Sequence, residues 1–181
     1  MLVADSSTTK EVAFSQKDAV KRPNSLEAET HQVKVKGKDY LVIISTMTNH
    51  PYEVFVIPDA ITACKKVKVV KEKKGLYNMY DEDGIVCIEN IGSKVTEDEA
   101  AITRLISTAL RHGTDVKHLV DQLNKTEGNM VGFSKAISRT LKKYIPEGTK
   151  SGTKCNECGG SNIIFKEGCS SCLDCGSSKC G

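Results

Sequence analysis

The hydrophobic pattern of the first half of the chain predicts strands. From His31, apolar and polar residues alternate in HQVKV, and after a turn at Gly37-Lys38 the apolar run YLVIIS indicates a buried strand. PYEVFVIP predicts another short strand, closed by Pro58, which cannot donate to a ladder. Weaker strand patterns follow in KKVKVV, LYNMY and IVCIEN, the last after a turn at DEDG. Together these segments predict an antiparallel sheet.

The period changes to that of a helix at Thr96. Thr96 and Glu99 form a capping-box pattern, and Gly113 is well placed to end the helix. The stripe expected to pack on the sheet consists of Ile102, Leu105, Ile106, Ala109 and Leu110. Shorter helices are expected in DVKHLVDQL and FSKAISRTLKKYI; the apolar side of the latter comprises Phe133, Ile137, Leu141 and Tyr144. The predicted fold class is α+β, with about three helices against a small antiparallel sheet.

Composition divides the chain into four segments. Residues 1–25 are polar and show no sustained period, which predicts a flexible N-terminal arm. Residues 26–145 carry the α+β pattern, and residues 146–154, PEGTKSGTK, predict a linker. Residues 155–181 form a separate cysteine-rich module.

Overall composition restricts the class of protein. Of the 181 residues, 39% are hydrophobic and none is tryptophan, so a mainly aliphatic core is expected. A net charge of +3 argues weakly against nucleic-acid binding by the whole chain. No apolar run reaches the ~20 residues of a membrane span, and the N-terminus does not resemble a signal peptide, so a cytoplasmic protein is expected. In that compartment, C-x-x-C pairs more often bind metal or exchange electrons than form structural disulfides.

Six of the eight cysteines lie in the C-terminal module. Cys155 and Cys158 form one C-x-x-C pair, Cys172 and Cys175 form another, and glycine follows each pair. Such loops let two thiolates face one zinc ion, because glycine permits the tight turn. The spacing therefore predicts a zinc ribbon in which these four thiolates are the ligands.

Two thiols of the module exceed the four that a tetrahedral zinc site needs. With the ligands above, the surplus pair is Cys169 and Cys180. The spacing C-x-x-C-x-x-C permits another ligand set, Cys155, Cys158, Cys169 and Cys172, which leaves Cys175 and Cys180. The sequence leaves both sets open, and the simpler alternative is that the extra cysteines are incidental or spare ligands. A free thiol pair near a chain end is suited to attack a disulfide elsewhere.

The tail CNECGG…EGCSSCLDCGSSKCG strongly resembles the C-terminus of class II ribonucleotide reductases, the adenosylcobalamin-dependent kind. The resemblance continues upstream in RPNSLEAETHQVKVKGKDYLVIIS, HPYEVFV and EAAITRLISTALRHGTDV, so it covers roughly residues 22–181. In that family it implies a zinc-binding tail whose cysteines relay electrons to the active-site disulfide formed each time a ribose is reduced. All six tail cysteines match the family by position.

The family's catalytic part is a large barrel that holds adenosylcobalamin, a radical-forming cysteine and the nucleotide, and 181 residues cannot contain it. The resemblance therefore implies an accessory small subunit of a split ribonucleoside-diphosphate reductase. Adenosylcobalamin would then be bound only by a partner catalytic subunit, and a thioredoxin-like or other dithiol would reduce the tail. A freestanding copy of the domain, cellular or viral, that is put to another use is the alternative.

A zinc-ribbon nucleic-acid-binding or regulatory protein is the competing functional class. The six lysines between Lys65 and Lys74 could contact phosphates, although an edge strand protected by lysines is the simpler interpretation. The cysteine-rich module has a net charge of −1, whereas a ribbon that grips a phosphate backbone should be basic. A purely architectural role for the domain would leave the surplus thiols unexplained.

The remaining cysteines and the histidines carry no recognisable motif. Cys64 and Cys87 lie on expected strands, where a free cysteine usually behaves as a small buried hydrophobe. The four histidines show no ligand spacing with one another or with the tail and are expected to be structural or surface residues.

Overall fold

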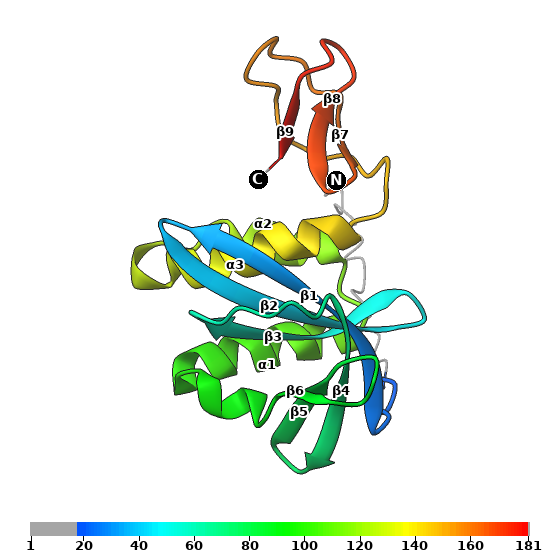
Figure 1. Ribbon diagram of the computed structural model, residues 1–181. Coiled ribbons are helices and arrows are strands. Elements are labelled where there is room, and N and C mark those ends of the chain that lie inside the picture. Colours follow the sequence, from blue (N-terminus) through cyan, green and yellow to red (C-terminus); the bar gives the residue numbers. More distant parts are fainter. Residues whose placement is uncertain (1–17, 181) are drawn as a thin grey trace, which may run out of the picture.

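The computed structural model describes residues 18–180 (Figure 1). Most of the expected N-terminal arm, residues 1–17, lies outside the described residues. The larger part of the fold is built from β1 (Ser25–Val35), β2 (Lys38–Met47), β3 (His50–Pro58), β4 (Lys66–Lys73), β5 (Leu76–Tyr80), β6 (Val86–Ile88), η1 (Ile91–Lys94), α1 (Glu97–Arg111), α2 (Val116–Leu123), η2 (Gly128–Met130), α3 (Val131–Leu141) and η3 (Lys142–Tyr144). The C-terminal part contains β7 (Ile163–Lys166), β8 (Cys169–Cys172) and β9 (Ser178–Cys180).

The predicted antiparallel sheet and three α-helices are confirmed within the described residues. The first six strands form one sheet in the order β3-β2-β1-β4-β5-β6, and every neighbouring pair is antiparallel. β1 pairs with β2 over residues 28–35 and with β4 over residues 25–29, so this long strand joins the two halves of the sheet. The smaller sheet has the order β7-β8-β9.

Strand β2 is buried on both faces, as its continuous apolar run predicts. Val42 and Ile44 belong to a core shared with α1, α2 and α3. Leu41 and Ile43, which point the opposite way, belong to a second core shared with β4, β5 and η1. Helices α2 and α3 lie over β1–β3 and α1 runs along the edge strand β3 (Figure 1). The β4–β5–β6 half of the sheet supplies side chains to the second core.

Helix α1 begins as the sequence predicts but buries a different stripe. Thr96 and Glu99 form a complete capping box, with both reciprocal hydrogen bonds present. Ile106 and Leu110 face the core, but the expected burial of Leu105 is wrong, because this side chain is 71% exposed. The buried face of α1 consists of Thr103, Ile106, Ser107 and Leu110. Since each residue turns the helix by about 100°, Leu105 lies on the opposite side.

The lysine-rich segment is not an edge strand. β4 lies between β1 and β5, and the edges of the six-stranded sheet are β3 and β6. Val67 and Val69 of β4 are buried, whereas Lys66 and Lys68, which alternate with them along the strand, are exposed. These lysines therefore occupy the solvent face of an internal strand and do not shield an edge.

The segment expected to be a flexible linker runs along the smaller sheet. The backbone N–H of Gly148 donates to Phe165, and that of Ser151 donates to Ile163, at 2.9 and 2.8 Å. Phe165 of β7 is itself 4% exposed and belongs to the same buried core as residues of α1, α2 and α3. These contacts attach the base of the cysteine-rich module to the α+β domain.

Candidate functional site

Four cysteines of the C-terminal module converge on one point. The Sγ atoms of Cys155, Cys158, Cys172 and Cys175 all lie within 4.8 Å of one another. The Cys155–Cys175 and Cys158–Cys172 Sγ distances are both 3.7 Å. Zn–S bonds of about 2.3 Å in a tetrahedral site place the sulfurs about 3.8 Å apart. The four thiols therefore fit a zinc ion in both chemistry and spacing.

The two C-x-x-C loops have the same backbone geometry. The N–H of Gly159 donates to the carbonyl of Cys155, and that of Gly176 donates to the carbonyl of Cys172, each at 2.9 Å. Both glycines have positive φ angles, 74° and 76°, which disfavour a side chain. The N–H of Gly160 also donates to Cys158 Sγ at 3.4 Å. The glycines found in the sequence thus shape the loops that present the thiols.

The module has little apolar material of its own. Among the described residues, its separate buried cluster consists of Cys155, Ile163 and Cys172. Two of these three residues are candidate metal ligands. A bound metal would therefore supply most of the folding free energy that a hydrophobic core supplies in a larger domain.

Ser177 adjusts the chemistry of this cluster. Its Oγ lies 3.2 Å from the Sγ atoms of both Cys155 and Cys175. Hydrogen bonding to Ser177 is the largest influence on both thiols. Together with backbone hydrogen bonds from Cys158 and Glu157 it lowers the pKa of Cys155 to about 6, and together with the backbone of Ser177 it lowers the pKa of Cys175. Because metals bind the thiolate form, the serine favours the form needed for coordination.

The remaining two cysteines of the module are bonded to each other. Cys169 on β8 lies directly opposite Cys180 on β9, and the two form a disulfide. The ligand set that includes Cys169 is not brought together, because Cys175 takes the fourth place in the cluster. Cys169 and Cys172 are three residues apart on β8, so their side chains leave opposite faces of that strand. β8 therefore carries one member of the cluster and one member of the disulfide.

Cys64 and Cys87 form a contact that the sequence did not predict. They are half-buried, and their Sγ atoms are 3.2 Å apart. Cys64 lies in the segment before β4, and Cys87 lies in the short strand β6. Interpreting each as an isolated buried hydrophobe missed the pair, because local periodicity contains no information on which distant segments meet. None of the described histidines belongs to either group of possible metal ligands that the structure brings together.

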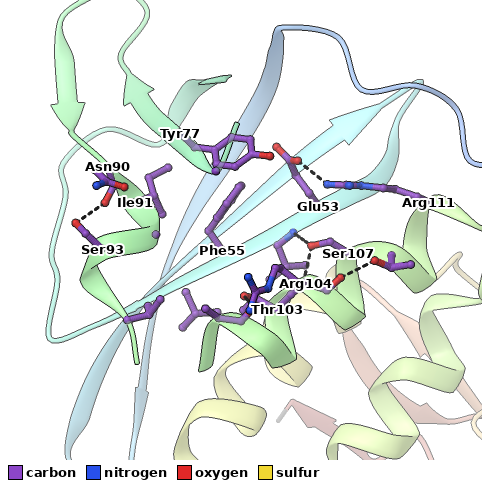
Figure 2. A pocket seen from close by; sticks show the side chains of 17 residues that line it. Glu53, Phe55, Tyr77, Asn90, Ile91, Ser93, Thr103, Arg104, Ser107 and Arg111 are labelled. Atoms are coloured by element: carbon purple, nitrogen blue, oxygen red, sulfur yellow. Dashed lines mark hydrogen bonds and ion pairs between the residues drawn. The ribbon is translucent and has the colours of Figure 1, made fainter. Parts of the chain in front are cut away.

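A cavity of about 590 Å³ lies between the sheet and α1 (Figure 2). Its walls include Phe55 and Tyr77, whose ring centroids are 5.3 Å apart. Arg104 and Arg111 of α1 line it from the other side. This cavity could not be predicted from local sequence patterns, since its lining comes from four separate segments.

Glu53 is the buried charge at the edge of this cavity. Its side chain is 1% exposed, and its carboxylate accepts two hydrogen bonds from Arg22, at 2.7 and 2.9 Å. Arg111 Nη2 donates to the same carboxylate at 3.0 Å, and Ser45 Oγ donates at 3.1 Å. The carboxylate is therefore fully paired, and it ties the chain before β1 to the end of α1.

Comparison with known proteins identifies the larger domain. A sequence model of the NrdJ homologue C-terminal domain matches residues 26–146, about two thirds of the chain. The chain belongs to this family. NrdJ is the class II, adenosylcobalamin-dependent ribonucleotide reductase, so the NrdJ homologue domain confirms a relation to that class of enzyme.

The NrdJ homologue match covers the strands and helices from β1 to η3 and ends before Cys155. No curated protein and no solved structure matches the chain significantly. None of the described helices has the length and apolar character needed to cross a membrane.

Proposed function

We propose that this chain is an accessory subunit of an adenosylcobalamin-dependent ribonucleoside-diphosphate reductase and supplies electrons to a separate catalytic subunit. The observation that carries the proposal is the Cys169–Cys180 disulfide, which lies beside a four-cysteine cluster in a chain whose larger domain is of the NrdJ homologue type. The domain match supports association with the reductase, and the disulfide supports the redox role.

The proposed reaction is thiol–disulfide exchange. The Cys180 thiolate attacks the catalytic subunit's disulfide, forms a mixed disulfide and releases one catalytic thiolate, which takes up a proton. The Cys169 thiol then loses its proton and displaces the second catalytic sulfur. The products are a reduced catalytic pair and the Cys169–Cys180 disulfide seen in the structure. A thioredoxin-like protein or another dithiol returns this disulfide to two thiols and is itself oxidised.

The position of the pair suits this reaction. β9 has three exposed residues and pairs only with β8, at the edge of the smaller sheet. A short edge strand with few buried contacts opens locally at low cost. Once the disulfide is reduced, Cys180 can therefore leave β8 and reach a partner without unfolding the module.

The four-cysteine cluster has the supporting role. Cys155, Cys158, Cys172 and Cys175 would hold a zinc ion, which supplies folding free energy where the apolar cluster is small. Thiolates bound to zinc would also be protected from thiol–disulfide exchange. The two electrons of each reduction would therefore be carried by Cys169 and Cys180 alone.

The test uses the class II catalytic subunit of the same organism, with thioredoxin and thioredoxin reductase as electron source. The wild-type chain should sustain many rounds of ribonucleotide reduction. A Cys180→Ser variant should bind the catalytic subunit and keep its zinc but stop after the round supported by the catalytic subunit's own thiols. Added dithiothreitol should restore turnover, because only the electron supply is lost.

Ser178→Ala, on the same strand as Cys180, is the matched control and should support normal turnover. Equal turnover with the wild-type and Cys180→Ser chains would refute the relay. If the wild-type chain neither binds the catalytic subunit nor raises its turnover, the accessory-subunit assignment is wrong as well.

A further inference from the structure

The second pair of cysteines, Cys64 and Cys87, lies in the larger domain, away from the zinc-type cluster. Their Sγ atoms are 3.2 Å apart, about 1.2 Å more than the ~2.0 Å of a disulfide bond. The two residues come from different parts of the chain, and the pairing of strands brings them together. This contact is therefore a property of the fold and not of a local motif.

A β-bulge positions Cys87. Met79 of β5 pairs with Ile88, and the next residue, Tyr80, pairs with Val86, so Cys87 is the extra residue between two ladder positions. β6 is also an edge of the sheet. Bulges at sheet edges re-aim side chains and recur next to functional sites. Here the bulge accompanies a thiol that meets a second thiol.

Strand β1 holds Cys64 on the other side of the contact. The Thr30 hydroxyl donates to the carbonyl of Cys64, and the Thr30 N–H donates to the carbonyl of Lys65 at 2.9 Å. Thr62 Oγ1 also accepts from the N–H of Cys64 at 3.2 Å. The segment before β4 is thus tied to the centre of the sheet, which keeps the Cys64 sulfur in place.

Solvent reagents can reach the pair. Both cysteines are half-buried. Ile61, three residues before Cys64, and Ile85, two residues before Cys87, are 78% and 64% exposed. Asp81 has a carboxylate oxygen within 4.8 Å of both sulfurs, and Glu82 and Asp83 line the same hollow as Cys64. Burial, followed by the contact with Cys64, raises the pKa of Cys87 to about 11. At neutral pH Cys87 is therefore protonated, which makes exchange slow but does not prevent it.

We propose that Cys64 and Cys87 are a second redox site, which forms a reversible disulfide by exchange with oxidised glutathione. The Cys64 thiolate attacks glutathione disulfide and releases one glutathione thiolate, which is then protonated. Cys87 loses its proton and displaces the second glutathione from the mixed disulfide. Two protein thiols become one disulfide, and one glutathione disulfide becomes two glutathione thiols. The bond would join β6 to the segment before β4.

The experiment uses the full chain with Cys169→Ser and Cys180→Ser, so that the tail pair cannot react and the four cluster cysteines remain. The zinc-loaded protein is incubated with glutathione buffers of increasing oxidised fraction, quenched by alkylation and digested for mass spectrometry. The expected result is joint loss of alkylation at Cys64 and Cys87 with a peptide cross-linked between them. Dithiothreitol should reverse it, and the bond should form faster at pH 9 than at pH 7.

Single Cys64→Ala and Cys87→Ala variants in the same background are the matched controls. Each should yield only a mixed disulfide with glutathione at the remaining thiol. Independent glutathionylation of both cysteines without a cross-link would overturn the proposal. Equally, a second zinc ion per chain that protects Cys64 and Cys87 from alkylation until it is chelated would show a metal site there instead. Neither result depends on the tail, so the proposal fails or stands separately from the electron relay.

Discussion

At the scale of single residues, the clearest feature is a charge that is buried but completely paired. Glu53 is 1% exposed and contacts Arg22, Arg111 and Ser45. Removing one member of a buried ion pair strands the other charges without a partner, which is far more costly than losing an exposed pair. Glu53 therefore connects three distant segments at a position where substitution is poorly tolerated.

Glu53→Gln should lower the free energy of unfolding by about 3 kcal/mol, because two guanidinium groups lose their counter-charge in a buried site. Glu27→Gln is the matched control, since Glu27 pairs with Lys68 at 3.5 Å with both side chains at least half exposed. That change should cost less than about 1 kcal/mol. Urea denaturation of the three proteins measures both effects, and equal losses would contradict this account of Glu53.

His31 makes the stability depend on pH. Its pKa is lowered, first by burial and then by Lys143, while Glu29 opposes the shift. Its Nε2 lies 3.1 Å from the Tyr144 hydroxyl. Because the folded state holds a proton on His31 less readily than the unfolded state, this group's stabilising contribution is complete above the unfolded pKa. It is lost as the pH falls toward and through the lower, folded value.

The wild type should therefore lose more stability between pH 7 and pH 5 than a His31→Gln variant, which keeps a polar group near Tyr144 but has no titrating ring. Urea midpoints measured at half-unit pH intervals give the difference. Parallel pH dependence of the two proteins would show that His31 does not titrate with a lowered pKa.

At the scale of elements, the sequence predicted the strands and helices well because their signals are local. Alternation from His31 predicted the second part of β1, which begins six residues earlier at Ser25, and the apolar run predicted β2. Thr96 predicted the start of α1. Strand order was not predictable, since β1 pairs not only with its hairpin partner β2 but also with β4, which is distant in sequence. This is why the lysines of β4 were assigned to an edge. The burial expected for Leu105 was wrong for a different reason: the apolar pattern does not show which side of α1 packs on the sheet, and Leu105 lies on the opposite side.

The capping box of α1 should be worth about 1 kcal/mol. Thr96 Oγ1 accepts from the Glu99 N–H at 3.3 Å, and the Glu99 carboxylate accepts from the Thr96 N–H at 3.0 Å. Thr96→Ala removes the first bond and exposes an unpaired N–H, so the urea midpoint should fall. Thr108→Ala, on the exposed side of the same helix, should change stability by less than about 0.5 kcal/mol.

At the scale of the whole molecule, two parts differ in what holds them together. The α+β domain has two large apolar cores, whereas the separate cluster of the C-terminal module has three buried residues. The position of the cysteine cluster could be predicted because C-x-x-C-G loops encode it locally. The docking of Phe165 into the helical core could not, since it depends on packing between distant segments.

Chelation of zinc should therefore unfold the module selectively. Hydrogen–deuterium exchange should rise across β8 and β9 after treatment with a chelator, while the buried strand β2 stays protected. A Cys158→Ser variant should show the same pattern without chelator. Uniform loss of protection in both parts would mean that the module and the α+β domain unfold as one unit.

The division of the six tail thiols into a cluster of four and a bonded pair also restricts which disulfides can form. Six free cysteines allow 15 complete pairings, so a reduced tail without metal is a combinatorial problem for oxidative folding. When Cys155, Cys158, Cys172 and Cys175 are occupied, one pairing remains, Cys169 with Cys180. The metal then acts as a protecting group in the synthetic chemist's sense, because it fixes the outcome of oxidation before any oxidant arrives.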